Sequence, residues 1–127
     1  MEVGKVESWD ILDGNGNKTG KTIQRGKAMG QDEYHLVMNV WIKNNNGEFL
    51  ITKRTPNKKI SPNMWEVTCG AAIIDEDSLK AALREVKEEI GIDLSRSNGK
   101  CLFRLKRQNY DFPDFVDVWL FLSLIHI

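Results

Sequence analysis

Apolar runs separated by clusters of Gly, Asn and Pro divide this chain into short segments, a pattern typical of β-strands joined by turns. The predicted strands span residues 8–13, 21–26, 35–42, 48–54, 65–68, 102–106 and 115–124. The Gly- and Asn-rich segments 13–20 and 43–47 tolerate positive φ, so each predicts a hairpin. Segment 56–62 is a predicted loop and segment 95–99 a linker.

One segment, residues 79–90, has helical periodicity instead. It contains no Gly, Pro or Thr, and its apolar residues recur at helical spacing: Leu79, Ala82, Leu83, Val86 and Ile90. Asp77 or Ser78 can cap the N-terminus, and Gly91 provides a C-terminal stop. Strands interleaved with one strong helix predict an α/β sandwich built on a mixed sheet.

Composition is that of one small globular domain covering residues 1–127. The apolar fraction is 41%, the charged fraction 28% and the formal net charge zero, with no polybasic tract. These values argue against a nucleic acid polymer or an anionic membrane as the main partner. No apolar run approaches the length of a membrane span, and Cys69 and Cys101 do not make a disulfide framework, so the expected location is cytoplasmic.

Carboxylates gather on the predicted helix. At roughly 100° per residue, Glu85, Glu88 and Glu89 project from a face about 100° wide beside the apolar one. Like charges at this spacing destabilise a helix by about 0.2–0.5 kcal/mol per pair, and a divalent cation would reverse that sign. Oxygen ligands suit magnesium. Arg84, one turn before Glu88, can pair with it and keep it ionised.

The helix belongs to a longer pattern, G-x5-E-x7-R-E-U-x-E-E-x-G-U with U aliphatic, which residues 70–92 match without a gap. Its fixed positions are Gly70, Glu76, Arg84, Glu85, Glu88, Glu89, Gly91 and Ile92. The pattern resembles the signature box of the Nudix hydrolase family. Segments 35–54 and 62–70 also resemble the central sheet of that family. The chain departs from the family at Cys69 and at Asp75, where Gly is common.

The resemblance implies a Nudix-type α/β/α sandwich and a magnesium-dependent hydrolase, for which manganese can substitute. Such enzymes cleave the diphosphate linkage of a nucleoside diphosphate joined to another group, a small-molecule substrate. It further implies that Glu85, Glu88 and Glu89 are catalytic metal ligands together with the Gly70 carbonyl. Arg84 would orient them, and Glu76 would support the loop or an outer metal shell. The general base stays open between a box glutamate and a residue of a later loop.

Residues outside the box are candidates for substrate binding. Lys53 and Arg54 end a predicted strand that points toward the box, where Arg54 could clamp phosphate or be solvated surface. Four aromatic residues could include a base-stacking platform, although core packing is the alternative for each: Trp9, Tyr34, Trp41 and Trp65. Three aspartates could add a ligand or base or serve turn chemistry: Asp111, Asp114 and Asp117.

Two other functions are compatible with parts of the sequence. Segment 34–70 is also similar to isopentenyl diphosphate isomerase, in which residues matching Cys69 and His35 act, but Ala71 stands where the isomerase has a histidine. A noncatalytic nucleotide-binding module with the same fold is the third possibility, although such modules tend to lose box glutamates and this chain keeps them. The apolar run 115–127 predicts that the sequence is truncated and lacks a closing strand and helix, or that its last few residues are foreign to the family. Poor solubility or homodimerisation is the expected result of an uncovered strand.

Overall fold

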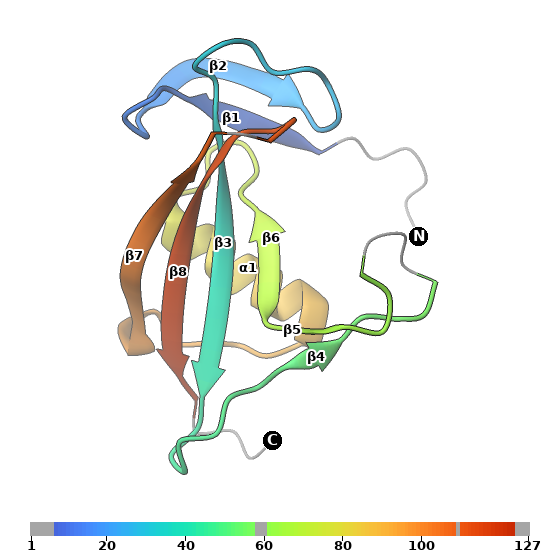
Figure 1. Ribbon diagram of the computed structural model, residues 1–127. Coiled ribbons are helices and arrows are strands. Elements are labelled where there is room, and N and C mark those ends of the chain that lie inside the picture. The colour runs from blue at the N-terminus through green and yellow to red at the C-terminus, as the bar shows by residue number, and fades with distance from the viewer. Residues whose placement is uncertain (1–6, 58–60, 109, 124–127) are drawn as a thin grey trace.

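The computed structural model describes residues 7–57, 61–108 and 110–123. Its centre is a four-stranded sheet in the order β6 (Thr68–Ala71), β3 (His35–Lys43), β8 (Asp114–Leu122) and β7 (Gly99–Arg107), as Figure 1 shows. Strand β3 runs parallel to β8, whereas β3–β6 and β7–β8 are antiparallel. The predicted mixed sheet is therefore confirmed.

The N-terminal hairpin consists of β1 (Ser8–Leu12) and β2 (Lys18–Gln24) and lies across one end of the sheet (Figure 1). Its turn closes where Asp13 Oδ1 accepts hydrogen bonds from the backbone N–H groups of Asn15 and Asn17. An antiparallel bridge between Leu12 and Tyr34 connects the hairpin to the residue that precedes β3. This arrangement brings β1 and β2 beside the end of the sheet where the site lies.

The helix α1 (Ser78–Ile90) covers one face of the sheet (Figure 1). Asp77 is the cap, because its Oδ1 accepts a hydrogen bond of 2.7 Å from the backbone N–H of Lys80. Gly91 ends the helix at φ 71°, a left-handed conformation. The buried core between helix and sheet is continuous and includes Met38, Val40, Ile42, Ala81, Ala82, Val86 and Phe121. The predicted helix and both of its ends are confirmed.

The predicted strand 48–54 is wrong in extent, and its predicted hairpin with β3 forms only next to the turn at 43–47. Only Thr52–Lys53 (β4) is a strand, and it pairs with Trp65–Glu66 (β5) instead of with β3. Strand β8 pairs with β3 along its whole length, and β6 occupies the other edge of β3 at Val37–Val40. The returning segment therefore pairs with β3 only at its end, where Lys43 forms a bridge with Phe49 and the Leu50 N–H donates to the Ile42 carbonyl at 2.9 Å. The predicted linker likewise contains a short 3-10 helix, Arg96–Asn98, followed by the early start of β7.

The other face of the sheet has a small apolar cluster, Val37, Val116 and Val118, and no α-helix among the described residues covers it. The second helical layer of the expected sandwich is thus not found within the described residues. Strand β8 accounts for most of the terminal apolar run, and residues 124–127 lie outside the described part of the chain. No helix in the ranges described has the length and apolar character needed to cross a membrane.

Candidate active site

The loop between β6 and α1 is organised by Glu76, a buried carboxylate. It accepts hydrogen bonds from the backbone N–H of Ile73 at 2.9 Å and from Arg84 Nε at 2.7 Å and Nη2 at 2.9 Å. Asp75 in the same loop has φ 68°, the left-handed region that favours glycine. Its N–H donates to Asp10 Oδ2 of β1 at 2.9 Å, which holds the unusual conformation in place.

Arg84 connects the loop to the acidic face of α1. Its Nη2 donates to the Ala71 carbonyl at 3.0 Å, and its Nη1 donates to Glu85 at 3.0 Å and to Glu88 at 3.1 Å. The hydrogen bond with Glu76 raises the pKa of Arg84 above its ordinary value, so the guanidinium stays charged. The predicted pairing of Arg84 with Glu88 is confirmed, and Arg84 holds two of the box glutamates.

Glu85 is the buried member of the acidic face and lies against Gly70 of β6. A Cβ added at Gly70 would approach the Glu85 carboxyl carbon to 2.3 Å, so only glycine leaves room for this carboxylate. Burial raises the pKa of Glu85, and the neighbouring Arg84 opposes that rise. A cation beside Glu85 would also favour the ionised form.

The three glutamates Glu85, Glu88 and Glu89 do not all face the same cavity. Glu85 and Glu89 line one large cavity, whereas Glu85 and Glu88 line a second hollow beside it. Accordingly, no three His, Cys, Asp or Glu side chains of the described residues converge closely enough to hold a metal ion. The ligand atoms that these residues present are nonetheless carboxylate oxygens, which suit a hard divalent cation such as magnesium. Hydrogen bonds from Arg84 hold Glu85 and Glu88 in the observed arrangement.

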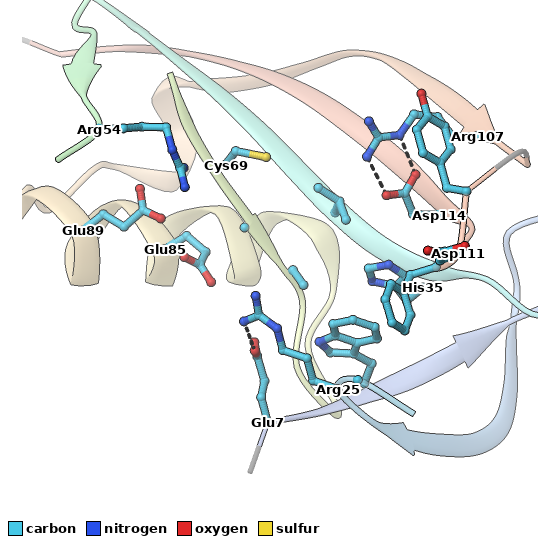
Figure 2. A pocket seen from close by; sticks show the side chains of 17 residues that line it. Glu7, Arg25, His35, Arg54, Cys69, Glu85, Glu89, Arg107, Asp111 and Asp114 are labelled. Atoms are coloured by element: carbon cyan, nitrogen blue, oxygen red, sulfur yellow. Dashed lines mark hydrogen bonds and ion pairs between the residues drawn. The ribbon is translucent and has the colours of Figure 1, made fainter. Parts of the chain in front are cut away.

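The large cavity has a volume of about 820 Å³ and runs from α1 across the end of the sheet. Figure 2 shows its two ends. Glu85, Glu89 and Arg54 lie at one, which we call the metal end. His35, Arg107, Asp111 and Asp114 lie at the other, which we call the distal end. Cys69 lies between them on the strand that leads into the box, and Glu7 and Arg25 pair along one side (Figure 2).

The distal end is built on an ion pair between neighbouring strands. Arg107 of β7 donates to both oxygens of Asp114 of β8, from Nε at 2.7 Å and from Nη2 at 2.6 Å. Asp114 is only 4% exposed. The Arg107 guanidinium carbon lies 4.9 Å from the centre of the Tyr110 ring. Arg107 is therefore fixed from two sides.

His35 forms the floor of the distal end and is buried. Its ring stacks on Trp9 with 3.8 Å between ring centres and 6° between planes. Burial lowers the pKa of His35 from 6.5, and the Asp114 carboxylate opposes that fall. The His35 imidazole is therefore neutral at neutral pH.

Of the residues outside the box that the sequence predicts to bind substrate or metal, some line the cavity and others do not. Arg54 lines the cavity and donates to both oxygens of Glu66 at 3.1 and 3.2 Å. Lys53 is not among the lining residues, and its ammonium nitrogen lies 5.9 Å from the centre of the Trp65 ring. Asp111 and Asp114 line the cavity, but Asp114 is engaged by Arg107. Asp117 is buried and pairs with Arg104 instead.

The aromatic candidates are also dispersed. Trp9 lines the cavity as a buried wall, and Tyr34 belongs to the core. Trp41 and Trp65 line a separate hollow that meets the cavity at Cys69. Core packing, the alternative for each residue, holds for the buried Trp9 and Tyr34, and a stacking role for the exposed Trp41 or Trp65 stays a prediction. The exposed rings in the cavity are Tyr110 and Phe112, which the sequence reasoning missed.

Arg25 and Arg107 were missed as well. For Arg107 a signal exists, because Arg104 and Arg107 on one strand match Asp117 and Asp114 on the next across a hairpin. Cross-strand pairing of opposite charges at that spacing would have predicted both ion pairs. For Arg25 no such signal is present in the sequence.

Known proteins that are similar to this chain share one domain family. The NUDIX domain family model matches residues 33–125. An uncharacterized Nudix hydrolase of Listeria monocytogenes (lmo0368) is 39% identical over 119 residues, covering 93% of this chain and 68% of that protein. The chain therefore spans about two-thirds of that relative's length.

Two further similarities are informative. The isopentenyl-diphosphate Delta-isomerase of Escherichia coli is 30% identical over 87 residues, covering 67% of this chain and 47% of the isomerase. The crystal structure of DR0079 from Deinococcus radiodurans superposes with a TM-score of 0.72 at 25% identity, covering 94% of this chain and 74% of that one. The described fold is thus shared across nearly the whole chain.

Proposed function

This chain belongs to the NUDIX domain family, and we propose that it is a magnesium-dependent hydrolase that cleaves the diphosphate linkage of a nucleoside diphosphate joined to another group. The observation that carries the proposal is the complete box: Arg84 joins Glu76, Glu85 and Glu88 in one network beside a large cavity. A magnesium or manganese ion, when bound, supplies charge neutralisation on the phosphate oxygens and an activated water.

The roles of the box residues follow from their contacts. Glu85, Glu88 and Glu89 would hold the cation, with the Gly70 carbonyl as a further ligand. Arg84 would orient Glu85 and Glu88, as its hydrogen bonds to both support. Glu76 would act as the support of the loop, because its two oxygens already accept three hydrogen bonds.

Arg54 is the proposed phosphate clamp. It lies at the metal end of the cavity, and Glu66 fixes one edge of its guanidinium. A planar guanidinium held in this way suits a phosphate better than a flexible ammonium does. Lys53, which lies over Trp65, has no place in the proposed site. The free thiols of Cys69 and Cys101 are consistent with a cytoplasmic enzyme.

The function is tested by a turnover screen of diphosphate compounds with magnesium and with a chelator. We expect cleavage of at least one compound that stops on chelation. Glu88→Gln and Glu89→Gln should each lower kcat by about 100-fold or more, because a contact to the reacting centre is lost. Asp93→Asn is the matched control, since Asp93 is an exposed carboxylate paired with Lys87 outside the cavity. Unchanged turnover in both glutamine variants would overturn the site assignment.

The screen should include isopentenyl diphosphate. His35 and Cys69 both line the cavity, which is the observation that favours an isomerase as second candidate. Burial raises the pKa of Cys69, however, so its thiol stays protonated, and Ala71 supplies no imidazole beside Gly70. Exchange of isopentenyl diphosphate protons with solvent would favour the isomerase, and ligand binding without any turnover would favour a noncatalytic module.

A further inference from the structure

Two hollows flank the acidic face of α1, and the proposed function uses only the larger one. The second has a volume of about 610 Å³ and lies between the ends of the N-terminal hairpin, the loop before α1 and the helix. We propose that this second hollow holds the group on the far side of the diphosphate, so that the substrate lies across Glu85 with a bulky group on each side. The inference rests on the proposed function and deepens it, because it narrows the class of substrate.

The two hollows meet at one place, which we call the junction. Three residues line both of them: Glu7, Arg25 and Glu85. Glu89 lines only the large cavity and Glu88 only the second hollow. A cation held by these glutamates would lie at the junction, together with the phosphates that it neutralises. The two groups joined by the diphosphate then extend away from the junction, and a hollow is present for each.

Arg25 supplies a phosphate contact at the junction. Its Nη1 donates to Glu7 Oε2 at 2.9 Å, and its backbone N–H donates to the Glu7 carbonyl at 2.8 Å. Figure 2 shows its side chain extending toward Glu85 from the side opposite Arg54. Within the described ranges, Nε and Nη2 of Arg25 have no acceptor. These donors are left for phosphate oxygens, which a planar guanidinium binds well.

The second hollow is bounded by backbone that is hydrogen-bonded on two sides. The Ile74 N–H donates to the Ser8 carbonyl at 3.1 Å, and the Asp75 N–H donates to Asp10 Oδ2 at 2.9 Å. These bonds join the first strand of the hairpin to the loop before α1. The hairpin cannot move onto the helix and close the hollow without breaking them.

The lining of the second hollow decides which far group fits. Ile73 and Ile74 provide apolar surface, and Ile74 is 37% exposed. Ser8 and Arg25 provide polar groups beside it. The volume lies within the range of about 300–1,000 Å³ typical of small-molecule pockets and exceeds what one phosphate group needs. A sugar or a second nucleoside combines carbon surface with hydroxyl groups, whereas a terminal phosphate would leave the isoleucine surface uncovered.

The first experiment compares two adenosine compounds at the same magnesium concentration. One is adenosine diphosphate joined to a sugar, the sugar compound, and the other is adenosine triphosphate, whose far side carries phosphate alone. We expect kcat/KM to be about tenfold or more higher for the sugar compound, because only its far group covers the isoleucine surface. Equal values, or a preference for the triphosphate, would overturn the inference while leaving the hydrolase intact.

Substitutions of Ile74 test whether the second hollow causes this preference. Ile74→Trp fills the hollow and should lower the ratio of the two kcat/KM values about tenfold, mainly through KM of the sugar compound. Ile74→Ala removes apolar contact without added bulk and should lower the ratio by a smaller factor, which covers the case of a tryptophan variant that does not fold. Ile51→Trp is the matched control, since Ile51 is 47% exposed and lines neither hollow. A wild-type ratio in both Ile74 variants would contradict the assignment.

Arg25→Gln tests the junction separately from the hollow. It should raise KM for both compounds about tenfold and leave their ratio unchanged, because both carry the phosphates. Wild-type KM for both would show that the phosphates do not lie at the junction, which overturns the inference. If neither compound is cleaved, calorimetric binding in the presence of magnesium decides: tighter binding of the sugar compound that Ile74→Trp weakens about tenfold supports the second hollow, and equal affinities overturn it.

Discussion

The two ends of the cavity are built in opposite ways. The box glutamates near the metal end come from α1 and the loop before it, and Arg84 joins three of them, Glu76, Glu85 and Glu88. At the distal end the side chains come from β3, β7, β8 and the loop between the last two strands (Figure 2). The proposed metal ligands and their arginine thus come from one contiguous segment, residues 70–89, whereas the distal end is assembled from segments far apart in the sequence.

The charged groups of the two ends also differ in how completely they are paired. Glu85 and Glu88 both accept hydrogen bonds from Arg84, so a cation that bound these carboxylates would change their arrangement. Arg107 and Asp114 at the distal end already satisfy each other with two hydrogen bonds. We therefore expect the metal end to rearrange on binding its cation and the distal end to be preformed.

Among glycine-to-alanine substitutions, the largest loss of kcat should come from Gly70 at the metal end. Gly70→Ala places a methyl group 2.3 Å from the Glu85 carboxyl carbon and must displace that carboxylate. A displacement of about 1 Å at the reacting centre lowers kcat by about 10- to 100-fold. Steady-state kinetics of the folded variant measure this loss.

The matched control is Gly99→Ala, in which the new methyl group would lie 2.3 Å from the Phe121 ring, away from the cavity. Overpacking of that kind costs about 1–3 kcal/mol of stability. Its melting temperature should fall while kcat stays near the wild-type value. Equal loss of kcat in both variants would mean that Gly70 has no special relation to the site.

A smaller effect is expected from His35 at the distal end. Because its pKa is lowered from 6.5, the unfolded chain binds more protons than the folded one as the pH falls below 6.5. The free energy of unfolding should therefore decrease as the pH falls from about 7.5 to about 5.5, and His35→Gln should lose part of that decrease. Melting temperatures across this range measure it.

Asp114→Asn provides the opposing variant in that experiment, since the Asp114 carboxylate works against the lowering of the His35 pKa. Its removal should make the loss of stability on acidification steeper. Identical pH profiles for the wild type, His35→Gln and Asp114→Asn would show that the imidazole is not held neutral by its burial.

The elements that could be predicted from sequence are those whose causes are local. Asp77, the apolar spacing of α1 and Gly91 lie within one segment, so the helix and its ends follow from that segment alone. The box fixes Arg84 one turn from Glu88, and the ion pair results. The family resemblance supplied the roles of these residues, which no local rule gives.

The features that could not be predicted depend on long-range arrangement. Strand β4 leaves β3 because β6 and β8 already occupy the edges of that strand, a fact that appears only once the sheet order is known. The split between Asp114, in the cavity, and Asp117, outside it, depends on which face of β8 each occupies. Asp75 adopts positive φ because Asp10, far away in sequence, accepts from its N–H.

Manganese binding to the whole chain without substrate, followed by electron paramagnetic resonance, distinguishes a cation site on the acidic face of α1 from one at the distal end. We expect Glu85→Gln, Glu88→Gln and Glu89→Gln each to weaken manganese affinity about tenfold or more, since each removes an anionic oxygen ligand, and Asp114→Asn to leave it unchanged. Wild-type affinity in all three glutamine variants, or its loss in Asp114→Asn, would contradict the account.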